Sequence, residues 1–267
     1  MHVQGLDRSG VVLRYCEDGR REAPSTLIFV NSLGTDLRIW LDIARVFSQT
    51  MRVVRYDKRG HGMSDAPDAP YSLDDHVDDL DALLEHLNID NAIIVGVSVG
   101  GMIAQGVALK SPARVKGLVL CDTAAKIGTE EAWDERIDEI RANGLSAIAD
   151  GIMERWFSSG FRASSPAELR LWRNLLTRTP VEGYVGTCAA LRDADMRETV
   201  GTLDLPVLCI CGDEDGATPP EVVRELATMI PGATYQEISR SGHLPCVEQP
   251  AILANAIAAF ISENGFG

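Results

Sequence analysis

Basic residues are scarce in this chain. Its 267 residues include 25 Lys and Arg against 39 Asp and Glu, so the formal net charge at pH 7 is −14. A protein that binds nucleic-acid phosphates needs a basic face, and a surplus of carboxylates repels phosphates. The composition therefore disfavours a nucleic-acid-binding protein. In other respects it is that of a globular domain, with 45% hydrophobic and 24% charged residues.

Long apolar runs are missing as well. No stretch approaches the roughly 18 uninterrupted apolar residues of a membrane-spanning helix, and residues 1–15 contain no apolar core of a signal peptide. The six cysteines form no C-x-x-C pair, so neither a disulfide framework nor a zinc site is indicated. We therefore expect a cytoplasmic protein that needs no metal and no membrane, with reduced and mostly buried thiols.

Short apolar runs rich in Val and Ile recur along the chain, each followed by a loop and then a helical pattern. Continuous hydrophobicity is typical of strands covered on both faces, as in a parallel sheet flanked by helices. The runs predict strands at 26–30, 52–56, 92–97, 115–121, 206–211 and 234–238. Periodic segments predict helices at 73–87, 99–110, 219–230 and 250–261. This alternation predicts an α/β fold.

The segment 126–197 departs from this rhythm. It has helical periodicity and no convincing strand, so we expect it to be a helical insertion, with residues 1–125 and 198–267 forming the sheet domain. Ten Lys and Arg against twelve Asp and Glu make the insertion nearly neutral on an otherwise acidic protein, and nine of the ten basic residues are Arg.

The sharpest motif is Gly96-Val97-Ser98-Val99-Gly100, which follows one predicted strand and begins a predicted helix. In this setting G-x-S-x-G is a nucleophile elbow, because small flanking residues let the backbone bend and lift the serine oxygen out of the sheet. The helix start also directs backbone N–H groups toward any anion formed there. Ser98 is therefore the candidate nucleophile.

A serine hydroxyl needs a base to take its proton. Among the five histidines, His243 lies in a loop between the last predicted strand and the final helix, and we expect it to be the base. His61 lies in a glycine-rich loop and is a weaker candidate. His2, His76 and His86 are expected to be solvated or to lie on a helix surface.

A third group, an acid, should fix the tautomer and orientation of the imidazole. Asp213, Glu214 and Asp215 all follow the predicted strand 206–211, and Asp122 follows the strand 115–121. Composition does not separate these carboxylates. The order serine, acid, histidine along the chain is that of α/β-hydrolases.

From about residue 25 to residue 260, the chain resembles the α/β-hydrolases and, more narrowly, the 3-oxoadipate enol-lactonase family. The resemblance is carried by the segments 31–38, 55–57, 59–62, 122–128, 155–157, 183–184, 188–190 and 193–195. Its more specific marker is Asn31-Ser32, where many relatives have His-Gly. The family pattern G-x-x-D-x-x-T-P falls on Gly212, Asp215, Thr218 and Pro219, and it implies Asp215 as the acid of the triad.

The same resemblance implies an α/β-hydrolase fold with a mostly parallel sheet and a helical cap. It implies an oxyanion hole made by the backbone N–H groups of Leu33 and Val99, with Val99 standing where the family usually has Met. We expect this Val to change the shape of the pocket wall while leaving the N–H in place. The implied reaction opens the ring of 3-oxoadipate enol-lactone, a small anionic lactone of the β-ketoadipate pathway of aromatic degradation, without a metal or organic cofactor.

Substrate contacts are expected from the insertion. Arg suits the acetate arm of such a lactone because it binds a carboxylate through two hydrogen bonds, and Arg155 is the candidate. Trp133 and Trp156 are either an apolar pocket roof or simple core. The main alternative is a general carboxylesterase or another small-lactone hydrolase, since a triad specifies acyl transfer and not the acyl group. A carbon–carbon bond hydrolase, a dehalogenase or epoxide hydrolase, and a ligand-binding receptor are less favoured, and the oligomeric state stays open.

Overall fold

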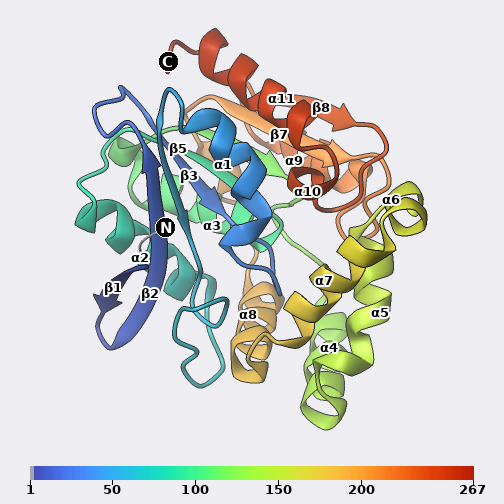
Figure 1. The fold of residues 1–267 in the computed structure, drawn as a ribbon. Coiled ribbons are helices and arrows are strands. Elements are labelled where there is room, and N and C mark those ends of the chain that lie inside the picture. The colour runs from blue at the N-terminus through green and yellow to red at the C-terminus, as the bar shows by residue number, and fades with distance from the viewer. Residues whose placement is uncertain (1–2) are drawn as a thin grey trace.

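The computed structural model describes residues 3–267, which form an eight-stranded sheet in the order β1-β2-β4-β3-β5-β6-β7-β8 (Figure 1). β1 and β2 pair antiparallel with each other, and β2 pairs antiparallel with β4. All the other pairings are parallel. The strands are β1 (Gln4–Arg8), β2 (Val11–Gly19), β3 (Thr26–Val30), β4 (Arg52–Tyr56), β5 (Ala92–Val97), β6 (Val115–Cys121), β7 (Val207–Gly212) and β8 (Thr234–Ile238). The predicted α/β fold with a mostly parallel sheet is confirmed.

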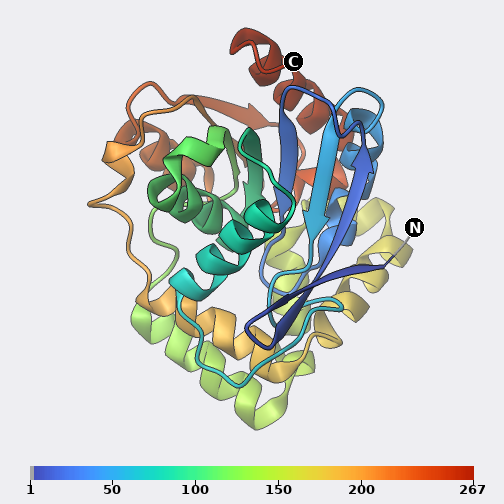
Figure 2. The same cartoon turned by 90° about the vertical axis from the view of Figure 1, so that its left-hand side faces the viewer.

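The central strands are buried because helices cover both faces of the sheet. β3, β5 and β7 are buried along their whole length. On one face α2 (Leu73–His86) packs against α3 (Val99–Lys110), and on the other α1 (Leu41–Phe47) packs against α11 (Pro250–Glu263) (Figures 1 and 2). α9 (Pro220–Met229) packs on β7 and β8, and α10 (Pro245–Glu248) precedes α11.

The β1–β2 hairpin is the part of the sheet that the apolar runs did not predict. β2 reads Val-Val-Leu-Arg-Tyr-Cys-Glu-Asp-Gly, and only three of its positions are buried. A strand near the antiparallel edge of a sheet needs apolar residues on one face only, so it carries no continuous hydrophobic run. The predicted strand 206–211 lies one residue later in the structure, and the other five predicted strands have the expected bounds.

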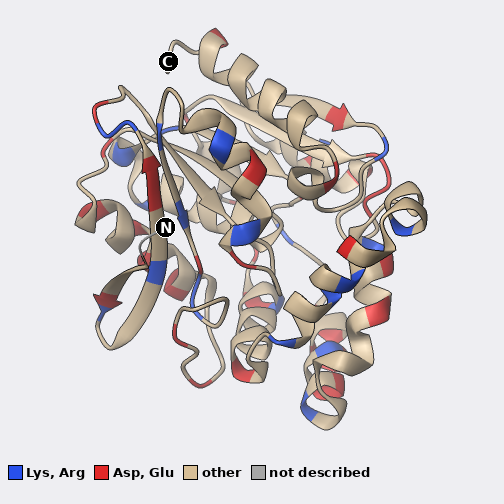
Figure 3. Cartoon of the chain, in the orientation of Figure 1, with Lys and Arg blue, Asp and Glu red and all other residues tan. Residues whose placement is uncertain are grey.

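Five helices lie between β6 and β7, as the helical insertion predicts. They are α4 (Glu130–Asn143), α5 (Leu145–Trp156), α6 (Ser159–Ser164), α7 (Pro166–Thr177) and α8 (Val181–Asp193). They gather at one end of the sheet (Figures 1 and 2), and residues of both charge signs lie on α4, α5 and α7 (Figure 3). Short 3-10 helices at Leu37–Trp40, Pro112–Arg114 and Val200–Thr202 complete the described chain.

The six cysteines are all buried and unpaired, as expected. Within residues 3–267, no helix combines the length and the apolar character needed to cross a membrane.

Candidate active site

Ser98 lies between the end of β5 and the first residue of α3, in a turn that forces its backbone into an uncommon conformation. Its φ is 60° and its ψ is −125°, a left-handed region that residues with a side chain seldom adopt. The turn is tight on both sides. A Cβ on Gly96 would lie 2.2 Å from the Gly100 carbonyl oxygen, and one on Gly100 would lie 2.3 Å from the Val30 carbonyl oxygen. The two glycines are therefore required by close backbone approach.

His243 lies in the loop after β8 and is paired with Asp215, which follows β7. His243 Nδ1 and Asp215 Oδ2 are 2.9 Å apart, and both side chains are buried. Asp215 Oδ2 also accepts a hydrogen bond from Thr218 Oγ1 at 2.8 Å, and Oδ1 accepts from the Ala217 and Thr218 amides at 2.7 and 3.1 Å. Burial alone would raise the pKa of Asp215, but the adjacent His243 and these hydrogen bonds outweigh it and lower the pKa.

Ser98 and His243 line one cavity, which lies beyond the carboxyl ends of the parallel strands, where open α/β sheets bind ligands. The sheet side of its wall includes Ser32, Leu33 and Thr218, and the inserted helices add Trp133, Arg136, Arg155, Trp156 and Tyr184. Within residues 3–267, no hydrogen bond engages the Ser98 hydroxyl. Hydrogen bonds of catalytic groups often tighten only when substrate binds, so the hydroxyl is available to a ligand in the cavity.

The amides of Leu33 and Val99 lie in the loop after β3 and at the first position of α3. Within residues 3–267, neither N–H donates a hydrogen bond to another group. The Leu33 residue lines the cavity, whereas the Val99 side chain is fully buried and is not part of the lining. The expectation that Val99 reshapes the pocket wall is therefore wrong, because its side chain packs in the core beneath the elbow.

Two buried side chains from the loop after β4 hold the segment that carries Leu33. Lys58 Nζ donates to the Ser32 carbonyl at 2.7 Å, and the Gly34 amide donates to His61 Nε2 at 2.9 Å. His61 Nδ1 lies 3.1 Å from the Arg59 carbonyl, which places its proton on Nδ1. Burial lowers the pKa of both Lys58 and His61 well below their usual values. His61 is thus engaged in holding a loop and does not face Ser98 as a base.

Two arginines of the insertion line the cavity, and only one of them was expected. Arg155 Nε donates to the Gly216 carbonyl at 3.0 Å, and the Arg136 guanidinium lies 4.8 Å from the centre of the Trp133 ring. Other arginines of the insertion pair with carboxylates: Arg141 with Glu182, Arg173 with Asp150 and Arg192 with Asp134. Within residues 3–267, Arg136 and Arg155 form no such ion pair. Their two guanidinium groups are therefore available to bind an anion.

Arg136 was missed because it lies in a helix that begins Glu-Glu-Ala-Trp-Asp-Glu-Arg. An Arg among so many carboxylates looks like part of a solvated surface, and its spacing of three residues from Trp133 is the one signal that places both on the same helix face.

Trp133 and Trp156 were expected to be either an apolar pocket roof or simple core, and they are both. They are 7% and 5% exposed and belong to the hydrophobic core, and both line the cavity. Trp133 Nε1 donates to the Ile127 carbonyl at 2.6 Å, which fixes the ring.

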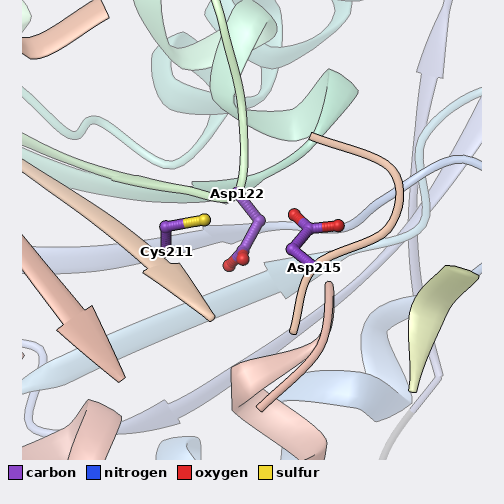
Figure 4. Close-up of side chains that lie close together, drawn as sticks. All are labelled: Asp122, Cys211 and Asp215. Atoms are coloured by element: carbon purple, nitrogen blue, oxygen red, sulfur yellow. The ribbon is translucent and has the colours of Figure 1, made fainter. Parts of the chain in front are cut away.

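The other acid candidates lie in different surroundings. Asp213 and Glu214 are exposed and accept hydrogen bonds from the Ser241 and Ser159 amides. Asp122 is fully buried beside Asp215 and Cys211 (Figure 4). Each of the three side chains offers one possible metal-ligand atom, a carboxylate oxygen or the thiol sulfur, and these atoms lie within 4.8 Å of one another. This group does not suit a metal ion, because a metal binds the thiolate form of cysteine. Burial raises the pKa of the Cys211 thiol, which donates instead to the Gly212 and Thr218 carbonyl oxygens.

His76 and His86, the other two histidines within residues 3–267, are not part of the cavity wall. His86 is exposed beside the Tyr15 hydroxyl, and His2 lies outside the described residues. The expectation of a solvated His76 is wrong. It is fully buried, with Nε2 3.4 Å from the Thr187 hydroxyl, and burial lowers its pKa to about 3.

Comparisons with known proteins agree with this architecture. Residues 25–250 match the alpha/beta hydrolase fold family. The chain is 37% identical to 3-oxoadipate enol-lactonase 2 of Acinetobacter baylyi, over 95% of this chain and 94% of that protein. It is 32% identical to 3-oxoadipate enol-lactonase 1 of the same organism, over 96% and 95%. The solved enol-lactonase of Burkholderia xenovorans LB400 superposes with a TM-score of 0.93 at 34% identity, covering 97% of this chain and 100% of that one. The chain therefore belongs to the α/β-hydrolase family and, within it, to the 3-oxoadipate enol-lactonases.

Proposed function

We propose that the protein hydrolyses 3-oxoadipate enol-lactone to 3-oxoadipate, with Ser98 as nucleophile, His243 as base and Asp215 as the acid of the triad. The observation that carries this proposal is the cavity that holds Ser98 and His243 together with Arg136 and Arg155, which form no ion pair with any described residue. A serine and histidine alone would serve any ester. The added positive charge suits a lactone that bears a carboxylate.

In the first half of the reaction, Ser98 Oγ attacks the ring carbonyl carbon while His243 takes the hydroxyl proton. The amides of Leu33 and Val99 stabilise the resulting oxyanion, and a single such donor contributes about 3 kcal/mol to lowering the barrier. The ring carbon–oxygen bond then breaks, and the leaving enol oxygen takes the proton from His243. The enol converts to the ketone, which favours ring opening.

In the second half, His243 removes a proton from water, and the hydroxide attacks the acyl-enzyme carbonyl. The same two amides stabilise the second oxyanion. Its collapse breaks the bond to Ser98 Oγ, which recovers its proton from His243, and 3-oxoadipate is released. Besides the lactone and one water molecule, each step uses only side chains and amides of this chain.

Arg136 and Arg155 bind the acetate arm of the lactone in this proposal. Burial, followed by the like charge of Arg136, lowers the pKa of Arg155, so bringing a carboxylate into the cavity relieves an unfavourable pairing of cations. Trp133 and Trp156 supply the apolar wall beside the ring.

The insertion 126–197 acts as a cap over the core formed by residues 1–125 and 198–267. We place the enzyme in the cytoplasm, because six unpaired cysteines are typical of a reducing compartment. The proposed reaction assigns the enzyme to the β-ketoadipate pathway of aromatic degradation.

The test compares kcat/KM for 3-oxoadipate enol-lactone with that for p-nitrophenyl acetate, a neutral ester. We expect the lactone to be the far better substrate and the Ser98→Ala variant to lose both activities. Ester cleavage with little lactone turnover would instead identify a general carboxylesterase.

A further inference from the structure

A second buried carboxyl group lies against the acid of the proposed triad. Asp122 follows β6 and is fully buried, and Figure 4 shows its side chain between those of Cys211 and Asp215. The Gly212 amide donates to Asp122 Oδ1 at 2.9 Å. Asp122 Oδ2 is equally buried, and within residues 3–267 it accepts no hydrogen bond from a backbone amide or from an oxygen or nitrogen donor.

An ionised Asp122 does not fit these surroundings. A bare carboxylate oxygen without a donor is costly to bury, and the cost rises when a second carboxylate lies beside it. The other titratable groups that face Asp122 are the thiols of Cys121, Cys211 and Cys246, and burial raises the pKa of each, so they carry no charge. The Cys211 thiol is directed to the Gly212 and Thr218 carbonyl oxygens.

Protonation of Oδ2 removes both difficulties. The unpartnered oxygen becomes a donor. An Asp215 oxygen lies within 4.8 Å of an Asp122 oxygen, and the two side chains are close enough to share a hydrogen bond. Burial and the neighbouring Asp215 raise the pKa of Asp122, while the hydrogen bonds to Asp215 lower the pKa of that residue, so the single proton of the pair stays on Asp122.

We propose that Asp122 is a positioning residue of the triad, held as a neutral carboxylic acid whose O–H donates a hydrogen bond to the Asp215 carboxylate. The Gly212 amide orients Asp122, Asp122 orients Asp215, and Asp215 orients His243. The hydrogen bond also stabilises Asp215 as an anion, the state in which it holds the imidazole. This inference rests on the proposed function, because it assigns Asp122 to the acid of that triad.

Infrared difference spectroscopy tests the protonation state without using activity. We expect a protonated carboxylic acid band at pH 7 in the wild-type protein that is lost in Asp122→Asn. Asp213→Asn is the control, since Asp213 is an exposed carboxylate in the neighbouring loop, and it should leave the band in place. A spectrum that Asp122→Asn does not alter in this region would show an ionised Asp122 and overturn the proposal.

Kinetics test the donor role. Asn keeps an N–H donor at the position of the carboxylic O–H, so kcat should stay within about threefold of the wild-type value. Asp122→Leu removes the donor, and kcat should fall about tenfold with little change in KM, because a hydrogen bond to a charged group is lost. Equal losses in the Asn and Leu variants, or no loss in the Leu variant, would overturn the role of the donor.

The two proposals fail in different ways. If the infrared band behaves as expected but Asp215→Asn retains full lactonase activity, the carboxyl pair exists and the proposed triad is wrong. If the triad variants are inactive and the band is missing, the triad stands and the role of Asp122 is wrong.

Discussion

At the scale of single residues, we expect positive charge in the cavity to decide which substrate is preferred. Arg136→Met should raise KM for the enol-lactone by tenfold to a hundredfold, since a charge-assisted hydrogen bond contributes about 1.5–3 kcal/mol. Turnover of p-nitrophenyl acetate should change little, because that ester carries no carboxylate. Steady-state kinetics on both substrates measure this difference.

Arg141→Met is the matched control for that variant. Arg141 lies on the same helix and forms an exposed ion pair with Glu182, and exposed pairs contribute little. Its kinetics on the lactone should match the wild type. An Arg136→Met variant that loses both activities equally would contradict a role in binding the carboxylate.

Single residues also mark the limit of what the sequence predicts. Ser98, His243 and Asp215 could be predicted as the candidate triad because a motif, a chain order and a family pattern single them out. Lys58, His76 and Arg136 could not, because a charged or polar residue in a loop or an acidic helix gives no local sign that it will face inward. Lys58 and His76 are fully buried and Arg136 is half-buried, and the elements that cover them come from distant parts of the chain.

At the scale of elements, the strand–turn–helix unit around Ser98 depends on its glycines. Gly100→Ala places a Cβ 2.3 Å from the Val30 carbonyl oxygen, so the turn must open, and we expect the free energy of unfolding to fall by about 2–4 kcal/mol. Gly151→Ala is the control, since α5 offers open space there, and helix propensity should raise stability by up to about 1 kcal/mol. Urea unfolding measures both. Equal free energies of unfolding for the two variants would contradict the claim that the turn around Ser98 has no room for a Cβ on Gly100.

The loop after β4 gives a pH-dependent prediction. Burial lowers the pKa of Lys58 in the folded protein well below 10.5, its value in the unfolded chain. At a pH between the folded and unfolded pKa values, the Lys58 amine therefore binds more protons in the unfolded chain than in the folded protein. Stability therefore rises with pH through this window, and the buried amine is destabilising at pH 7. Lys58→Met should raise the free energy of unfolding at pH 7 by about 1 kcal/mol, and this gain should shrink toward pH 10.

The same Lys58→Met variant should lower kcat several-fold with KM nearly unchanged, because the Ser32 carbonyl loses the donor that holds the loop of Leu33. Lys116→Met is the control for stability. Lys116 Nζ also donates to a backbone carbonyl, that of Pro24, but it is exposed, so its effect should not depend on pH. Urea unfolding at two pH values distinguishes the variants. A stability gain for Lys58→Met that persists at pH 10 would contradict the assigned cause.

Elements were predicted well wherever burial is two-sided. The runs that became β3 to β6 have the expected bounds, because a strand covered on both faces is apolar at most positions. β8 also has the expected bounds, although only Ile238 of this edge strand is buried. The β1–β2 hairpin and the short helices α1 and α10 were not predicted, since an element with one covered face, or only one or two turns, shows too little periodicity.

At the scale of the whole molecule, topology assembles a site from residues far apart in sequence. Parallel strands β3, β5 and β7 end at one edge of the sheet and deliver Leu33, Ser98 and Asp215 there, while the loop after β8 adds His243. The inserted helices add Arg136 and Arg155 from above the cavity. An acidic protein of net charge −14 thus offers an anion a local cationic pocket.

The sequence predicted the sheet domain and the helical insertion, but not how the insertion packs on the sheet domain. Helical periodicity indicates an insertion, and its many arginines favour it as the source of a carboxylate-binding group. Which arginine turns inward depends on how α4 and α5 pack on the core, and that packing is a property of the complete fold.

The most direct test of the central claim is rapid acid quenching of the enzyme during turnover of 3-oxoadipate enol-lactone, followed by peptide mass spectrometry. Attack on a lactone expels no fragment, so the acyl-enzyme should be heavier than the free protein by the mass of the entire lactone, with the adduct on the peptide that contains Ser98. It should be missing in Ser98→Ala. Undiminished lactone turnover by Ser98→Ala, or an adduct on another residue, would contradict the account.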